Sequence, residues 1–141
     1  MVDRCSPYLK GDIILKKLID ISEAELKILQ VLWERQPRTM PEITRTLAEE
    51  TNWSKNTVIT LLKRMIEKGT IKVNELVSPK EYTALVDFSS VAKQETKGFM
   101  KRMFCNKPTL LISNLISEQK VSDDEIDEII RMLQAHKEER T

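Results

Sequence analysis

The segment from residue 52 to residue 83 restricts the possible folds of this chain more than any other. Ser54 stands where a helix N-cap is expected and Gly69 stands where a helix would end in a left-handed residue, with apolar residues at helical spacing between them. Two short strands are predicted to follow, at about residues 71–77 and 81–85. A helix followed directly by a hairpin is the order in which a winged helix-turn-helix presents a recognition helix and a wing to DNA.

The two faces of this helix differ in chemistry. The residues expected to face a core recur at helical spacing and are Val58, Leu61, Leu62, Met65 and Ile66. Residues 55–72 contain five Lys or Arg and one acid, Glu67, so their local charge is +4, whereas the whole chain carries only +1. Because a protein contacts DNA with one face, a basic patch on one helix is compatible with nucleic-acid binding by a nearly neutral chain.

The polar face of the helix provides candidate contacts to base edges. Thr57 and Thr60 lie three residues apart, so their hydroxyls can reach bases and their methyls can touch thymine. Ile59 offers only the apolar contact, and Asn56 suits either adenine or a phosphate. The alternative is that the threonines are ordinary surface residues, and only their place in a winged-helix order favours a role in recognition.

Candidate phosphate contacts surround these residues. Positive charges suited to phosphates or guanine are Lys55, Lys63 and Arg64 on the helix and Lys72 and Lys80 on the wing. Trp53 and Ser54 precede the helix, where an indole N–H, a backbone N–H and a hydroxyl can hold a phosphate. Three alternatives stay open: Trp53 packs into the core, Arg64 pairs with Glu67, and Lys63 and Lys68 are simply solvated.

Two capped helices are predicted before the recognition helix. Residues 22–25 and 39–42 both read as capping boxes, and the second contains a proline in the first helical turn. The first helix would bury an apolar stripe and end at Pro37, and the second would be short and stop near Thr51. The inward-facing residues are expected to be Leu26, Leu29, Leu32 and Trp33 in the first helix and Ile43 and Leu47 in the second.

Three further helices are predicted after residue 85. One begins at Asp87 or Ser89 and reaches Phe104, a short apolar one begins near Pro108, and the last follows a capping box at 122–125. They carry more apolar surface than one small bundle needs, so we expect them to pair with a second copy of the chain. The residues predicted to supply this contact are Met100, Met103, Leu111, Leu115, Ile126, Ile130 and Leu133.

The predicted fold is therefore mainly α with a small β-wing, a winged helix-turn-helix DNA-binding domain followed by a three-helix dimerisation domain. Residues 1–20 are an N-terminal extension, 21–86 the DNA-binding domain and 87–141 the dimerisation domain. No apolar run is long enough to span a bilayer, so no membrane insertion is expected, and the start of the chain does not resemble a secretory signal.

Other chemistries find little support in the sequence. No Cys/His cluster has metal-ligand spacing and no P-loop or dinucleotide fingerprint is present, so we expect no metal, no cofactor and no enzymatic activity. The single histidine, His136, is expected to be solvated. The acids of residues 123–128 fit the first turns of a helix. Cys5 and Cys105 are interpreted as reduced thiols in a cytoplasmic protein.

These residues resemble the penicillinase repressor family of bacterial winged-helix repressors, which includes the methicillin-resistance repressors and the copper-transport repressors. The resemblance covers about residues 21–140. Its strongest matches are residues 21–26 with 31–33, Trp53-Ser54 with Thr57 and Thr60, the run from Arg64 through Gly69, and in the carboxyl half residues 99–106, Asn114 and 122–140.

The resemblance implies a homodimer that binds double-stranded operator DNA with an inverted repeat and represses transcription. In the antibiotic-responsive branch the operator controls β-lactamase or a resistant penicillin-binding protein. The copper-responsive branch carries Cys-x-Cys pairs near the carboxyl terminus, and residues 106–141 contain no cysteine. A metal-responsive repressor of the same fold and a winged helix that binds only protein remain as alternatives.

The resemblance also implies how repression ends. In the antibiotic-responsive members an inducer-activated protease cuts after an asparagine in the short middle helix of the dimerisation region. The matching bond is Asn114–Leu115, although the family pattern favours phenylalanine after the asparagine and leucine stands here. The alternative is that Asn114 is an ordinary polar helix residue and that a ligand releases the repressor.

Overall fold

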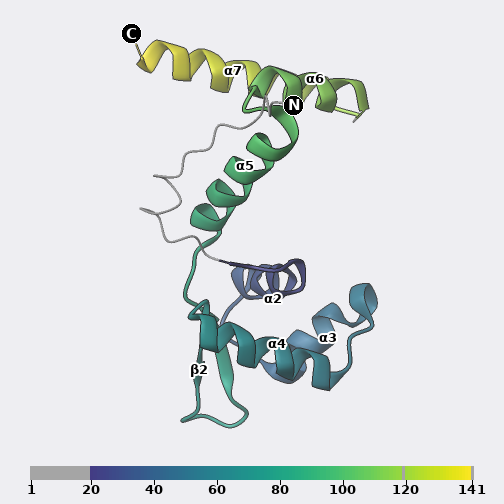
Figure 1. The fold of residues 1–141 in the computed structure, drawn as a ribbon, viewed down its shortest axis with the longest axis vertical. Helices are drawn as coiled ribbons and strands as arrows, with labels where there is room; N and C mark the ends of the chain where they lie inside the picture. The colour runs from purple at the N-terminus through teal and green to yellow at the C-terminus, as the bar shows by residue number, and fades with distance from the viewer. Residues whose placement is uncertain (1–19, 119, 141) are drawn as a thin grey trace, which may run out of the picture. The chain divides into compact units, whose positions relative to one another are not determined.

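The computed structural model describes residues 20–118 and 120–140. The predicted extension at 1–20 therefore lies outside the described residues, except for Asp20. The chain divides into two compact units, described separately below, with the boundary between Thr96 and Lys97. This boundary falls inside one helix, α5 (Phe88–Phe104), which belongs to both units (Figure 1).

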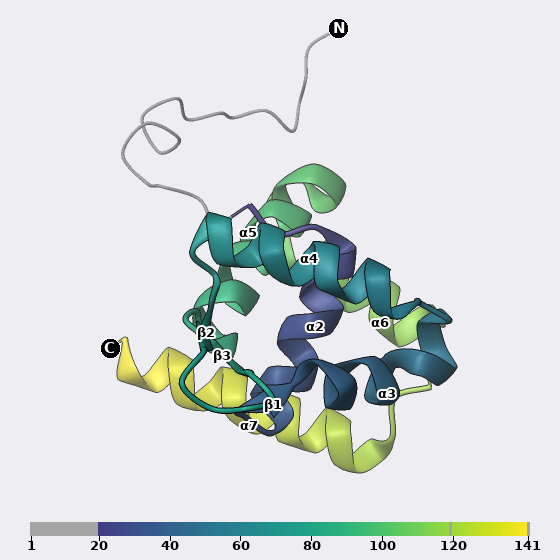
Figure 2. The ribbon, with the colours of Figure 1, turned by 90° about the horizontal axis from the view of Figure 1, so that it is seen from below.

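The amino-terminal unit is a three-helix core with a small sheet. Figure 2 shows α2, α3 and α4 grouped together with the strands at one side, and contacts join each pair of these helices. Its elements up to the start of α5 are α2 (Glu23–Glu34), β1 (Arg38–Thr39), α3 (Met40–Thr51), α4 (Lys55–Lys68), β2 (Ile71–Asn74) and β3 (Glu81–Ala84). This is the predicted winged helix-turn-helix, in which α3 and α4 form the helix-turn-helix and β2 and β3 form the wing.

The predicted apolar stripes meet in one core. The most deeply buried apolar side chains are Ile28, Leu29, Leu32, Ile43, Val58, Leu62, Met65 and Ile71. They come from all three helices and from β2, so burying them removes one face of each element from water and holds the elements together. Ile66 departs from the prediction: it is 36% exposed, because Met65 rather than Ile66 occupies the core side of that turn.

Side chains at both ends fix the limits of the helices. The capping boxes of α2 and α3 form as predicted, with Ser22 paired to Glu25 and Thr39 paired to Glu42. Backbone and side-chain hydrogen bonds from Thr39, together with the Arg35 guanidinium, lower the pKa of Glu42 from 4.5 to about 2. The predicted end of α4 is also confirmed, since Gly69 adopts a φ of +82° that an L side chain would make costly.

The sheet has three antiparallel strands in the order β1-β3-β2. The sequence did not predict β1, whose two residues pair with Tyr82 and Glu81 of β3 and are too few to show a pattern. It also placed the end of the first wing strand too late, at residue 77. The strand stops at Asn74, whose side-chain oxygen accepts a hydrogen bond from the Leu76 N–H at 3.0 Å and so begins the wing loop.

The carboxyl-terminal unit contains the end of α5, α6 (Pro108–Glu118) and α7 (Asp123–Glu139). The predicted capping box at Ser122 and Glu125 is present. The rings of Phe99 and Phe104 meet edge to face with their centroids 5.4 Å apart. All residues of α6 and α7 are described, and none of their side chains is buried. Within a single chain this unit therefore leaves its apolar residues exposed or only half-buried.

Two other expectations concern chemistry rather than fold. Cys105 is disulfide-bonded, so the interpretation of this residue as a reduced thiol is wrong, because separation along the sequence does not limit which side chains meet in space. Among the described residues, no helix is long and apolar enough to cross a membrane.

The core predicts a clear contrast between two leucine substitutions. Leu62 is 1% exposed within the core and Leu76 is 97% exposed at the wing tip. Leu62→Ala should lower the free energy of unfolding by about 2–5 kcal/mol, because it removes buried methyl groups and leaves a cavity. Leu76→Ala should change it by less than about 0.5 kcal/mol. Urea denaturation of both variants measures the difference, and equal losses would contradict this account of the core.

Candidate nucleic-acid interface

The outer face of α4 carries the side chains predicted to contact DNA. Burial of Val58, Leu61, Leu62 and Met65 on the inner side fixes the rotation of this helix about its axis. The predicted contact residues consequently lie on the solvent side, where Ile59 is half-buried and the exposed ones are Lys55, Asn56, Thr57, Thr60, Lys63 and Arg64. These side chains form one continuous surface, which we call the α4 outer face.

Hydroxyl groups on this face already make hydrogen bonds within the chain. The Ser54 hydroxyl accepts from the Thr57 backbone N–H at 3.2 Å, and the Ser54 and Thr57 hydroxyl oxygens lie 3.2 Å apart. The Thr60 hydroxyl donates to the Asn56 carbonyl at 2.9 Å. Since the Thr60 proton is used locally, its oxygen is left as an acceptor and its methyl as an apolar contact, so Thr60 would accept from a base amino group or touch thymine.

The start of α4 offers backbone donors to an anion. The first intrahelical bond runs from the Val58 N–H to the Ser54 carbonyl at 3.2 Å, and Ser54 caps Thr57, so the N–H groups of Lys55 and Asn56 precede the bonded part of the helix. Such N–H groups, with the positive end of the helix dipole, favour a phosphate oxygen. Ser54 therefore acts first as the helix cap, and its hydroxyl is less free for phosphate than the sequence suggested.

Of the two roles that the sequence left open for Trp53, the structure favours packing against the core. Its ring packs against the hydrophobic core and is half-buried. Its backbone N–H donates to the Thr51 hydroxyl at 3.2 Å, so this N–H is not directed at a phosphate. The contact with the core supports the structural alternative for the ring.

Most of the positive charges on the interface are unpaired. Within residues 20–118 and 120–140, no ion pair involves Lys55, Lys63, Arg64 or Lys72. The alternative pairing of Arg64 with Glu67 is therefore not formed. Lys80 differs, because its ammonium lies 3.2 Å from the Glu75 carboxylate across the wing loop. The charges that remain free for phosphates are thus those of Lys55, Lys63, Arg64 and Lys72.

Lys68 has surroundings that the sequence did not reveal. It was expected to be solvated, but its ammonium lies 2.8 Å from Glu25 Oε1 and only 28% of its side chain is exposed. Glu25 itself is buried, and the sequence analysis did not predict this burial. The capping box alone was a sufficient reason for a glutamate at this position. Helical periodicity was the available signal, since Glu25 stands three and four residues before the buried Ile28 and Leu29.

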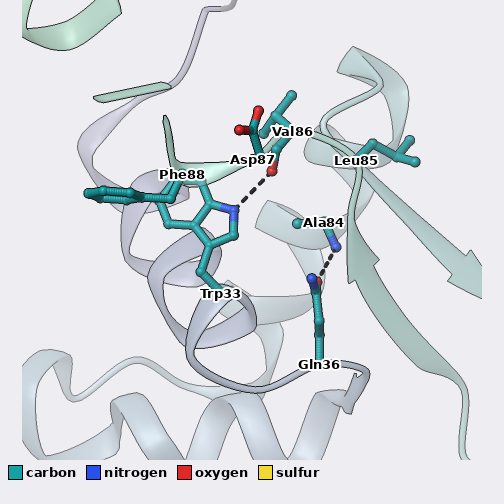
Figure 3. A pocket seen from close by; sticks show the side chains of 7 residues that line it. All are labelled: Trp33, Gln36, Ala84, Leu85, Val86, Asp87 and Phe88. Carbon is teal, nitrogen blue, oxygen red and sulfur yellow. Dashed lines mark hydrogen bonds between the residues drawn. The ribbon is translucent and has the colours of Figure 1, made fainter. Parts of the chain in front are cut away.

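A shallow pocket lies where β3 runs into α5 (Figure 3). It has a volume of about 280 Å³, and its lining residues are Trp33, Gln36, Ala84, Leu85, Val86, Asp87 and Phe88. The Trp33 indole N–H donates to the Val86 carbonyl at 2.9 Å, and the Gln36 side-chain oxygen accepts from the Ala84 N–H at 2.8 Å. These groups are already satisfied, so the contacts serve to fasten the connection into α5.

The start of α5 is held by the same cluster. The Trp33 and Phe88 rings meet edge to face at 5.5 Å. The Val91 N–H bonds to the Asp87 carbonyl at 3.2 Å, which places Asp87 rather than Ser89 at the cap of α5. A hydrogen bond from Ser90 lowers the pKa of the Asp87 carboxyl, as expected for a capping carboxylate.

The predicted dimerisation residues lie in the carboxyl-terminal unit with varied exposure. Met100, Leu111 and Ile126 are half-buried. The exposed members are Met103 at 59%, Leu115 at 38%, Ile130 at 45% and Leu133 at 60%. The candidate cleavage residue Asn114 is exposed in the middle of α6, and its carbonyl accepts a bond from the Ser117 hydroxyl at 3.3 Å. The single chain thus leaves these side chains accessible.

Known proteins are similar to this chain over most of its length. A penicillinase repressor of Bacillus licheniformis is 28% identical over 123 residues, which cover 87% of this chain and 96% of that protein. The methicillin resistance regulatory protein MecI of Staphylococcus aureus strain N315 is 26% identical over 117 residues, covering 83% and 95%. The solution structure of the DNA-binding domain of the repressor BlaI has 32% identity and a TM-score of 0.47, covering 53% of this chain and 92% of that domain.

The family comparison spans both units. The model of the family described as penicillinase repressor matches residues 21–135, from just before α2 to within α7. Together with a helix-turn-helix whose recognition helix is followed by a hairpin wing, this match shows that the chain belongs to the penicillinase repressor family.

Proposed function

We propose that this protein is a dimeric, cytoplasmic transcriptional repressor that binds an inverted-repeat operator and controls genes of β-lactam resistance. The observation that carries the DNA-binding part is the α4 outer face, where Lys55, Lys63 and Arg64 lack ion pairs among the described residues and stand beside two threonines. The relatives named penicillinase repressor and methicillin resistance regulatory protein support the choice of regulated genes.

In this mechanism α4 enters the major groove and the wing follows the backbone beside it. Thr57, Ile59 and Thr60 meet base edges, which supply sequence preference. Lys55 and Asn56 at the start of the helix meet phosphates, which fix its register. Lys63, Arg64, Lys72 and Lys80 add further backbone contacts, and Lys80 must exchange Glu75 for a phosphate to do so.

The DNA proposal predicts different effects for two kinds of substitution on α4. Thr57→Ala or Thr60→Ala should cost about 1–3 kcal/mol on the preferred operator and relax its sequence preference, because a base contact is lost. Lys63→Ala should weaken binding to all duplexes equally and reduce the salt slope by about one unit, because a phosphate contact is lost. Fluorescence anisotropy against salt measures both effects.

A double Thr57→Ala/Thr60→Ala variant provides the decisive comparison. If it bound the preferred operator as tightly as the original chain, α4 would not read the bases. If no duplex bound in a salt-dependent manner, the chain would instead be a winged helix that binds protein.

The dimer proposal rests on the exposed apolar surface of the carboxyl-terminal unit. None of the side chains of α6 or α7 is buried, although α6 includes Leu110, Leu111, Ile112, Leu115 and Ile116. Contiguous exposed apolar residues of this kind mark a protein-protein interface. A second copy of the chain would cover these apolar residues in a dimer with two-fold symmetry, and the same symmetry matches an inverted-repeat operator.

This surface predicts the effect of a charge at its centre. Leu115→Asp should convert the dimer to a monomer at micromolar concentration, because the carboxylate would be buried without a partner at the interface. Leu76→Asp, at the wing tip, is the matched control and should leave the mass unchanged. Sedimentation equilibrium measures both, and a monomeric original chain with and without DNA would contradict the proposal.

Release from DNA is proposed to follow cleavage of the Asn114–Leu115 bond by an inducer-activated protease. The bond lies within α6, and both flanking residues are exposed in the single chain. A cut there would divide the apolar helix and separate α7 from the rest of the chain. Both effects would weaken the dimer, and a monomer contacts only one half-site of a two-fold operator.

The cleavage proposal is tested by recovering the protein from its native host before and after addition of a β-lactam. We expect two fragments whose masses correspond to residues ending at Asn114 and beginning at Leu115. Asn114→Ala should remain intact and keep its genes repressed. Intact protein released from DNA would instead indicate a ligand, and titration of the reduced protein with metal ions would then test the metal-responsive alternative.

A further inference from the structure

The ion pair between Lys68 and Glu25 has no assigned role in the function described above. Lys68 is the last residue of the recognition helix α4, and Glu25 is the third residue of α2. We infer that these two residues are a positioning pair that holds the end of the recognition helix in place, and that Lys68 is not a DNA contact. This inference rests on the proposed DNA-binding function.

The geometry directs the Lys68 ammonium towards the start of α2. Its ammonium lies 2.8 Å from Glu25 Oε1 and donates to the Asp20 carbonyl at 3.0 Å. The Asp20 carboxylate is a further 3.7 Å neighbour. Two of the three N–H donors of Lys68 are therefore used, and both point towards the segment that begins α2.

Glu25 links this ammonium to the start of α2. The same Oε1 atom accepts the Ser22 backbone N–H at 2.9 Å, as part of the capping box. The Glu25 side chain is 2% exposed, and its other oxygen, Oε2, is buried with no hydrogen-bond partner among the described residues. Burial raises the pKa of this carboxyl, and the Lys68 and Ser22 contacts outweigh that effect, so the carboxyl stays ionised at neutral pH.

A buried carboxylate with one unpartnered oxygen is a poor way to gain stability. An apolar pair of similar volume is often as stable as a buried ion pair, because both charges lose their hydration. An ion pair has a direction that an apolar contact lacks, so it specifies which residue of α4 meets which residue of α2. We therefore assign the pair to setting the position of α4 along α2, which determines where the α4 outer face is presented.

The same arrangement separates Lys68 from the other cations of α4. A phosphate that withdrew Lys68 from Glu25 would leave a buried carboxylate without its counter-charge. Lys63 differs from Lys68, because it is exposed and forms no ion pair within the described residues. Removing the charge at these two positions should therefore have different consequences for DNA binding.

The experiment compares three variants of the full-length chain on two DNA probes. The variants are Lys68→Met, Glu25→Gln/Lys68→Met and, as the matched control, Lys63→Met. The probes are a duplex selected by the original protein from a random-sequence pool and an unselected duplex of equal length. Affinity for each probe is measured over a range of salt concentrations, and thermal unfolding reports whether each variant is folded.

The positioning role predicts a distinctive pattern. Lys68→Met should lose about tenfold in affinity for the selected duplex, because the end of α4 is no longer held by Glu25. It should keep the salt slope of the original chain, because no phosphate contact is lost. Glu25→Gln/Lys68→Met should recover most of that loss, because glutamine preserves the capping box and no buried charge remains. Lys63→Met should lower the salt slope by about one unit on both probes.

Two results would overturn the inference. A salt slope lowered by about one unit in Lys68→Met would make Lys68 a phosphate contact. A double variant no better than Lys68→Met would mean that the pair does not act as a unit. If Lys68→Met does not fold, the double variant alone decides: near-original affinity supports the role, and a tenfold loss refutes it.

Failure of the proposed function is recognisable separately. If the original chain selects no duplex, DNA binding itself is wrong, and hydrogen exchange then tests the position of α4 directly. Faster exchange of the amides in the last turn of α4 in Lys68→Met, but not in Lys63→Met, would support positioning. Equal exchange in the two variants would overturn it.

Discussion

Burial of one face of α4 against α2 and α3 is the constraint on which the rest of the amino-terminal unit depends. Val58, Leu62 and Met65 are almost completely buried, so rotation of α4 about its axis would expose apolar area and bring polar side chains into the core. The orientation of the opposite face follows from this packing. Lys63 and Arg64 are therefore presented to solvent because of residues that never meet DNA.

The ends of α4 are controlled by different forces. At its start Ser54 caps the helix and leaves two backbone N–H groups directed outwards. At its end Gly69 turns the chain into β2, and Lys68 is tied to Glu25. The helix thus combines a start open to an anion with an end anchored in the protein. Of its terminal cations, only Lys55 at the start is free of an ion pair within the described residues.

Sequence patterns predicted those features that arise from local interactions. The capping boxes, the Ser54 cap and the Gly69 stop were confirmed, because each depends on residues a few positions apart. The strand β1 and the burial of Glu25 were missed, since both depend on partners at least 40 residues away, Tyr82 and Lys68. The sign and spacing of charges predicted the α4 outer face, but they could not distinguish Lys68 from Lys63.

The two units differ in how far a single chain satisfies its own apolar residues. The amino-terminal unit buries large apolar side chains, including Ile28, Leu32 and Ile43, in one cluster. The helices α6 and α7 have periodic apolar residues but bury none of them. Apolar periodicity in a sequence shows that one face of a helix must be buried, but it does not show whether the same chain or another molecule buries it. In the first unit the same chain buries these residues, and we propose that a second copy of the chain covers those of α6 and α7.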